Sequence, residues 1–79
     1  SPSLDIVKLL IEDNYDLLIC EPNLKNYKEL PLTDCDKLIL NSDIIIFFVG
    51  HKEFIPYAKE LSENKKYIDF CGIMNPDFI

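Results

Sequence analysis

The sequence predicts an α/β fold, a small three-layer, Rossmann-like fragment in which short helices alternate with parallel strands. The first observation is the run at 43–50, where six consecutive residues between Asp43 and Gly50 are β-branched or aromatic. Such a run has no polar face, as in strands that are covered on both sides. The second observation is that helix-forming segments separate the apolar runs, which implies parallel pairing through right-handed crossovers. A buried helix is the alternative for 43–50, but its short length and Gly50 favour a strand.

The first expected element is a helix over residues 2–13. Ser1 can accept a hydrogen bond from a free first-turn amide, and Pro2 suits the first helical position because it has no amide to satisfy. The apolar face of this helix comprises Leu4, Val7, Leu10 and Ile11. Asp13 and Asn14 are expected to end it. A strand over 15–20 follows, and the Glu-Pro-Asn sequence at 21–23 ends it because proline cannot continue the ladder.

Residues 23–32 are polar and contain Pro31, so we expect a loop there. A second helix is expected over 34–41, with Thr33 as its cap and Asp36 near the positive end of the helix dipole. The side chains expected to face the sheet are those of Cys35, Leu38 and Ile39. This helix leads into the central strand at 43–49.

The third helix is expected over 56–63, with Pro56 as its first residue and an apolar side formed by Ala58 and Leu61. The third strand is expected over 66–71, and Gly72 permits a turn after it. Residues 73–79 show no periodicity, so we expect an irregular tail outside the fold.

Length and composition indicate one small domain, residues 1–79, without a linker or repeat. The chain starts at Ser1, without Met and directly at a helix-start signal, so a fragment of a longer protein is expected. No apolar run approaches the roughly 20 residues of a membrane span, so we expect no membrane partner. The net charge is −6 and the sequence contains no arginine, which makes nucleic acid an unexpected partner.

The three cysteines, Cys20, Cys35 and Cys71, are an odd number at wide spacing and form no Cys-x-x-Cys pair. Cys20 and Cys71 lie within or beside apolar runs, where a free thiol commonly packs as a small core residue. The sequence therefore predicts free thiols and a reducing, cytoplasmic location. It contains one histidine, so a multi-histidine metal site is not expected.

Candidate binding residues follow the central strand, because open α/β sheets bind ligands at the carboxyl ends of their strands. His51 and Lys52 stand at that position. A lone histidine there is commonly a surface or capping residue, so a structural role is the alternative. The two glycines, Gly50 and Gly72, form no phosphate-binding loop. Asp69 lies within a strand, where a buried carboxylate needs a partner, and we expect it to serve structure rather than catalysis.

Several segments together resemble the UDP-binding C-terminal domain of the UDP-glucose/GDP-mannose dehydrogenase family. They are Ser-Pro at 1–2, Glu-Pro-Asn at 21–23, Ser-Asp at 42–43, His-Lys-Glu-Phe at 51–54 and Asp-Phe-Cys-Gly-Ile at 69–73. The second and last segments are most similar to the members that act on UDP-N-acetyl-D-mannosamine. The resemblance spans roughly residues 1–73 and implies an oxidoreductase that uses NAD to convert a sugar alcohol to a carboxylate during polysaccharide biosynthesis.

The resemblance also implies what this segment lacks. No cysteine here matches the family's catalytic one, so no catalytic residue is carried over, and NAD would bind a domain outside the segment. His51, Lys52 and Cys71 are the implied UDP-sugar contacts, although Cys71 replaces a basic residue common in the family. The family's domain begins with an additional central strand, which this chain lacks. Implied partners are a UDP-sugar, the enzyme's other domains and a second copy, giving a homo-oligomer.

A truncated receiver-like or flavodoxin-like signalling module is the alternative function. Receivers need an acidic cluster after the first strand and a phospho-accepting aspartate after the third. Glu21 is isolated, and Gly50-His51 stands where an aspartate would be needed, so the sequence favours the dehydrogenase. A thiol-redox protein is disfavoured by the cysteine spacing.

Overall fold

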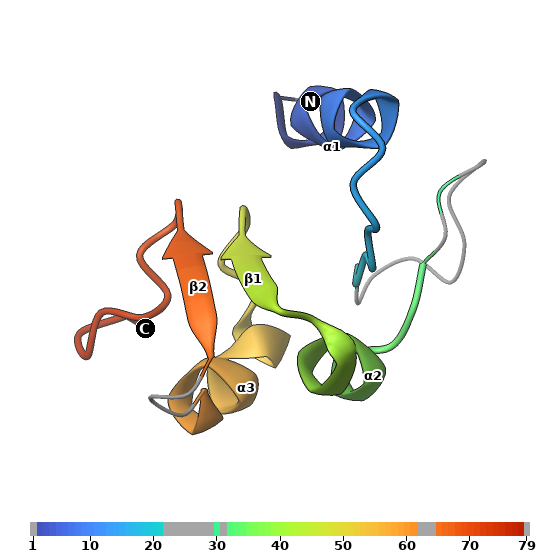
Figure 1. Cartoon of the computed structure of the whole chain (residues 1–79). Helices are drawn as coiled ribbons and strands as arrows, with labels where there is room; N and C mark the ends of the chain where they lie inside the picture. The colour runs from blue at the N-terminus through green and yellow to red at the C-terminus, as the bar shows by residue number, and fades with distance from the viewer. Residues whose placement is uncertain (1, 22–29, 31, 62–64, 79) are drawn as a thin grey trace.

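The computed structural model describes residues 2–21, 30, 32–61 and 65–78 and confirms the α/β class. Helix α1 spans Pro2–Glu12 and helix α2 spans Cys35–Asn41, followed by strand β1 at Ile44–Phe47. A 3-10 turn, η1, at Lys52–Phe54 continues into helix α3 at Ile55–Glu60, and strand β2 spans Lys66–Asp69. Figure 1 shows the two strands side by side, with α3 following β1 and α1 at some distance from the sheet.

The sheet of the described residues consists of β1 and β2, which pair in parallel. Ile44 lies opposite Lys66 and Phe47 lies opposite Asp69. The ladder continues by one bond, because the amide of Phe70 donates to the carbonyl of Phe47 at 3.0 Å. At the other end, the Lys65 ammonium donates to the carbonyl of Ser42. The parallel pairing and the α3 crossover between the strands agree with the sequence prediction.

The core lies on one face of this sheet. Ile45 and Phe47 alternate inward from β1 and pack with Ala58 of α3 and with Ile73. Leu38 and Ile39 of α2 and Leu61 after α3 pack against this cluster, as expected. The opposite face is poorly covered, since Ile44 is 54% exposed and Ile68 is 45% exposed. The expected second helical layer is therefore missing from that face among the described residues.

The predicted strand over 15–20 is not formed as a strand. Among the described residues, Ile19 alone makes a bridge, in parallel with Leu32, and the segment does not pair with β1. Tyr15 is 63% exposed and Leu18 is 40% exposed. The prediction of a strand at 15–20 was therefore wrong, because apolar composition alone does not form a strand, which needs a neighbouring backbone to complete its ladder.

The helix boundaries follow the sequence signals closely. Asn14 has a φ of 64°, the left-handed conformation that commonly ends a helix, so the stop after α1 is confirmed. The cap of α2 was predicted wrongly. Asp34, not Thr33, is the N-cap, and its carboxylate accepts a hydrogen bond from the amide of Lys37 at 2.8 Å. Aspartate and threonine are similar caps, and the observed start lies one residue later than predicted.

Helix α3 begins at Ile55, one residue before the predicted start at Pro56, and it ends at Glu60 rather than at 63. Pro56 still lies in the first turn, where the amide that it lacks would have no partner within the helix. The earlier expectations for Ser1, for 62–64 and for most of the 23–32 loop lie outside the described residues.

The prediction of a tail outside the fold was wrong. Ile73 is 5% exposed, and Phe78 packs so closely on Gly50 that an added Cβ there would lie 2.5 Å from its ring.

Candidate functional site

The carboxyl end of β1 carries the residues that the sequence singled out. The backbone leaves the strand at Phe47, passes through Gly50 and enters η1 with Lys52 at its first position. The thiol of Cys71 lies beside the same turn, 3.6 Å from where a Cβ of Gly50 would be. His51, Lys52 and Cys71 therefore lie around one turn, as expected for parallel strands whose carboxyl ends meet at one edge.

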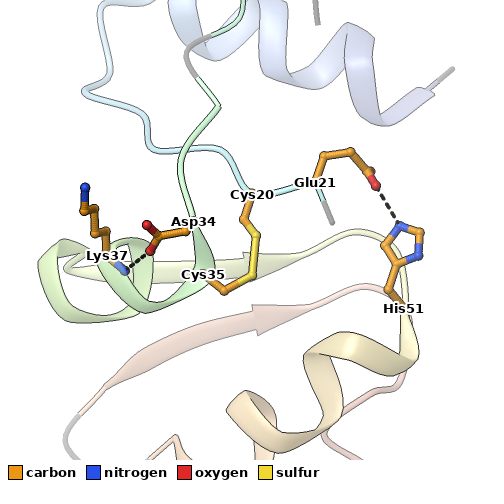
Figure 2. The surroundings of a disulfide bond; sticks show 6 residues. All are labelled: Cys20, Glu21, Asp34, Cys35, Lys37 and His51. Carbon is orange, nitrogen blue, oxygen red and sulfur yellow. Dashed lines mark hydrogen bonds and ion pairs between the residues drawn. A yellow bond between two sulfur atoms is a disulfide. The ribbon is translucent and has the colours of Figure 1, made fainter. Parts of the chain in front are cut away.

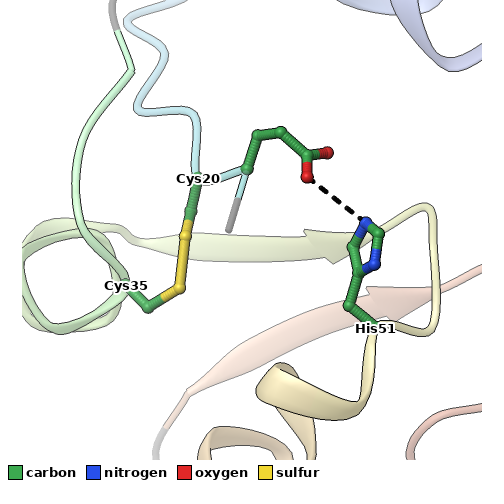
Figure 3. Close-up of polar contacts among 4 residues, drawn as sticks. Cys20, Cys35 and His51 are labelled. Carbon is green, nitrogen blue, oxygen red and sulfur yellow. Dashed lines mark ion pairs between the residues drawn. A yellow bond between two sulfur atoms is a disulfide. The ribbon is translucent and has the colours of Figure 1, made fainter. Parts of the chain in front are cut away.

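His51 is held by two neighbours. Its Nε2 lies 3.5 Å from a carboxylate oxygen of Glu21, and its ring packs edge-on against Phe54 with centroids 5.3 Å apart. Figure 2 shows the imidazole and the Glu21 carboxylate facing each other, and Figure 3 shows His51 beyond the end of β1 in a closer view. Glu21 thus reaches the candidate site from a segment far away in sequence. Glu21 is an isolated carboxylate in the sequence, and its contact with His51 arises only when the chain is folded.

A disulfide between Cys20 and Cys35 holds the Glu21 segment in place. The two residues are 15 positions apart, with their Cα atoms 5.6 Å apart. Figure 2 shows the bond joining the chain next to Glu21 to the first turn of α2. The prediction that Cys20 is a free core thiol was therefore wrong. Wide spacing and an odd cysteine count do not reveal which two residues the fold brings together.

Cys71 is a free cysteine, as predicted, and is half-buried. Its burial and the neighbouring Asp69 carboxylate raise the pKa of the thiol. The thiol also lies 3.4 Å from an oxygen of that carboxylate. A thiol that is neutral at pH 7 adds no positive or negative charge to the site. Lys52 is thus the one exposed cation among these three candidate residues.

Asp69 organises the backbone that carries Cys71. One carboxylate oxygen accepts from the amides of Cys71, Gly72 and Ile73 at 2.8–3.2 Å, and the other accepts from Met74 at 2.9 Å. Burial alone would raise the pKa of this carboxyl group, but these hydrogen bonds favour the charged form and the net shift is downward. The expectation that Asp69 needs a structural partner is confirmed.

The role of Asp69 predicts a pH-dependent stability. Because its folded pKa is lowered, its stabilisation is present above the unfolded pKa of about 3.8 and is lost as the pH falls through the folded value. We expect Asp69→Asn to lower the free energy of unfolding by about 1.5–3 kcal/mol at pH 7, since hydrogen bonds to a charged acceptor are weakened. Urea titrations between pH 7 and pH 2 measure this difference, which should shrink in acid. Asp77→Asn, on an exposed carboxylate, is the matched control; an equal loss in both variants would contradict the assignment.

A large groove lies between β1 and the N-terminal part of the chain. Its volume is about 1020 Å³. Its walls are mainly aliphatic and include Leu4, Val7 and Leu10 of α1 on one side and Ile44 and Ile46 of β1 on the other. His51 and Glu21 also line it, so the groove reaches the candidate site. This groove could not be predicted from the sequence, because the 15–20 segment was expected to be a strand.

Within the described ranges, no group of three or more histidine, cysteine, aspartate or glutamate side chains is arranged to hold a metal ion. No described helix is long and apolar enough to cross a membrane.

The chain is similar over nearly its whole length to two curated enzymes. It is 29% identical over 82 residues to a UDP-N-acetyl-D-mannosamine dehydrogenase of Methanococcus aeolicus, a match that covers 95% of the chain. It is 33% identical over 79 residues to the UDP-N-acetyl-D-mannosamine dehydrogenase of Campylobacter jejuni, covering 90% of the chain. This similarity relates the chain to a segment of the nucleotide-sugar dehydrogenases. The matched region is 18% of each of these enzymes, and neither a family model nor a solved structure matches significantly.

Proposed function

We propose that this chain is the UDP-binding C-terminal segment of an NAD-dependent nucleotide-sugar dehydrogenase that oxidises UDP-N-acetyl-D-mannosamine to the uronic acid. The similarity over 90–95% of the chain to two enzymes of that name carries the proposal. The position of His51 and Lys52 at the carboxyl end of a parallel strand supports it, because α/β sheets commonly bind nucleotides there.

In this proposal the segment contributes to substrate binding and the chemistry is done elsewhere in the parent enzyme. The sequence contains two glycines and no Gly-x-Gly-x-x-Gly, so NAD would bind another domain. Lys52 would face the diphosphate, with His51 beside it. Cys71 is half-buried and supplies no charge, so it would shape the site rather than neutralise a phosphate.

The site is poor in positive charge when the segment is alone. The Glu21 carboxylate lies 3.5 Å from His51, and a diphosphate would meet repulsion from it. We therefore expect the isolated chain to bind UDP weakly or not at all in a calorimetric titration. Submicromolar binding of UDP by the isolated chain would contradict this distribution of charge.

We propose that the parent enzyme is located in the cytoplasm, where NAD and nucleotide sugars are used. The cysteines do not support a cytoplasmic location, because Cys20 and Cys35 are paired rather than free. A homo-oligomer and the remaining domains of the enzyme are the proposed partners.

The test is an assay of the parent enzyme with UDP-N-acetyl-D-mannosamine, following NADH absorbance. We expect two NAD reduced for each sugar, as an alcohol is taken to a carboxylate. We expect Lys52→Ala to raise KM for the UDP-sugar by about tenfold, which is the loss of roughly 1.4 kcal/mol of phosphate attraction. Lys59→Ala, on an exposed position of α3, is the matched control. No NADH formation with any UDP-sugar would overturn the proposal.

A further inference from the structure

The disulfide and the Glu21–His51 contact are adjacent in the structure. Cys20 directly precedes Glu21, and its bond to Cys35 ties this part of the chain to the first turn of α2. The Glu21 carboxylate in turn lies 3.5 Å from Nε2 of His51. Figure 2 shows the disulfide, the carboxylate and the imidazole in that order. The disulfide therefore restrains the backbone that carries a carboxylate of the candidate site.

The segment before Glu21 is also held by backbone contacts, but these lie at Ile19. Ile19 bridges to Leu32, and its carbonyl accepts from the amide of Thr33 at 2.6 Å. The side chains of Glu21 and His51 are 30% and 23% exposed, and an ion pair that water reaches is weak by itself. A covalent bond restrains the chain more than one bridge and one such ion pair. The disulfide thus sets the position of Glu21.

The Glu21 carboxylate opposes the binding of an anion at the carboxyl end of β1. Lys52 is exposed there and can attract a phosphate, but the carboxylate beside His51 repels it. The same carboxylate also occupies the Nε2 side of the imidazole. When Glu21 moves away, the anion meets one negative charge fewer, and the imidazole is open to a phosphate oxygen. The candidate site therefore has two charge states that depend on where Glu21 lies.

The disulfide can be reached from solvent. Cys20 and Cys35 are half-buried, and both line the groove that also contains Glu21 and His51. In a reducing compartment such as the cytoplasm, a disulfide is commonly redox-sensing or catalytic rather than permanent. A reducible bond therefore agrees with the cytoplasmic location proposed for the parent enzyme.

A dithiol is the class of reductant that opens this bond by exchange. One thiolate of the dithiol attacks a sulfur of the disulfide, which breaks the bond between Cys20 and Cys35 and forms a mixed disulfide. The second thiolate of the reductant then displaces the protein sulfur. Both cysteines end as thiols, each with one electron and one proton gained, and the dithiol is oxidised to a cyclic disulfide.

We propose that the Cys20–Cys35 disulfide is a redox switch on the anion site at the carboxyl end of β1. The oxidised form holds Glu21 against His51 and disfavours a diphosphate, and reduction by a dithiol releases Glu21 and favours one. That the diphosphate belongs to a UDP-sugar rests on the proposed function. The switch itself rests on the disulfide, the Glu21–His51 contact and the charges around it.

The experiment compares the oxidised and the dithiothreitol-reduced 79-residue chain, with inorganic pyrophosphate as the probe at constant ionic strength. Nuclear Overhauser effects between Glu21 and the ring of His51 should be present in the oxidised chain and lost on reduction. We expect the reduced chain to bind pyrophosphate about fivefold more tightly, because one nearby negative charge is removed. Chemical shifts of the Lys52 amide follow the titration. The amide of Phe70, which donates to the carbonyl of Phe47, reports in both forms that the sheet is intact.

Two variants separate the charge of Glu21 from a general effect of reduction. Glu21→Gln in the oxidised chain keeps the disulfide and should bind pyrophosphate as tightly as the reduced chain does. Its reduction should then change the affinity less than about twofold. Asp16→Asn is the matched control, since it removes an exposed carboxylate from the same segment and groove and should retain the fivefold redox effect.

Three results would overturn the switch. They are equal pyrophosphate affinities of the two forms, no binding by either form at millimolar concentration, and loss of the Phe70 hydrogen bond on reduction. The last result would mean that the disulfide holds the whole fold rather than the position of Glu21. None of these measurements depends on dehydrogenase activity in the parent, so the switch fails separately from the NADH assay.

Discussion

Reducing the Cys20–Cys35 disulfide is expected to lower the free energy of unfolding by about 3 kcal/mol. The bond closes a loop of 15 residues, and opening it returns that loop entropy to the unfolded chain. A chain of this size has a modest total stability, so the loss should move the urea midpoint strongly. Urea titrations of the oxidised and reduced chain measure the difference. The double variant Cys20→Ala, Cys35→Ala should have the same free energy of unfolding as the reduced chain. Adding reductant to this variant should leave its urea midpoint unchanged.

The control for this prediction is the third cysteine. Cys71 is free, so Cys71→Ala should leave the effect of reductant unchanged. Thiol labelling of the folded chain without reductant should modify no more than one cysteine. Labelling of all three cysteines under those conditions would show that the disulfide is not formed.

Truncation of Phe47 is expected to abolish cooperative unfolding. Phe47 is 6% exposed and contributes to the buried cluster from the carboxyl end of β1, with the centroid of its ring 6.3 Å from that of Phe54. Loss of a buried phenylalanine side chain costs about 3–5 kcal/mol, which approaches the whole stability of a small domain. Circular dichroism against temperature is the measurement, and Phe47→Ala should show a broad, early transition.

Phe70→Ala is the matched control for Phe47. Phe70 stacks on Phe48 with centroids 5.5 Å apart, yet it is 67% exposed and lies on the uncovered face of the sheet. We expect it to cost less than about 1 kcal/mol. Equal losses in the two variants would contradict the placement of the core on one face.

The parts of the fold that follow from local chemistry were predictable. The β-branched run became β1, Pro56 lies in the first turn of α3, and Asn14 ends α1. These outcomes depend on side-chain shape and backbone conformation within a few residues. The need of Asp69 for partners was also predictable, since a carboxylate in a strand has few other solutions.

The parts that depend on distant contacts were not predictable. The 15–20 segment has the composition of a strand but lacks a neighbour beyond the Ile19 bridge. Residues 73–78 have no periodicity, yet Ile73 completes the core because the Asp69 turn directs it there. Pairing of Cys20 with Cys35 and of Glu21 with His51 likewise requires the folded chain. The position of His51 and Lys52 at a strand end was predictable from strand direction alone.

Amide proton exchange along β1 of the free chain tests the account most directly. A parallel β1–β2 pair with an open edge predicts slow exchange for Ile45 and Phe47, whose amides point towards β2. It predicts exchange at least about tenfold faster for Ile46 and Phe48. Equal protection of all four amides would mean a helix or a strand covered on both edges, and would contradict both the sheet and the groove described for this chain.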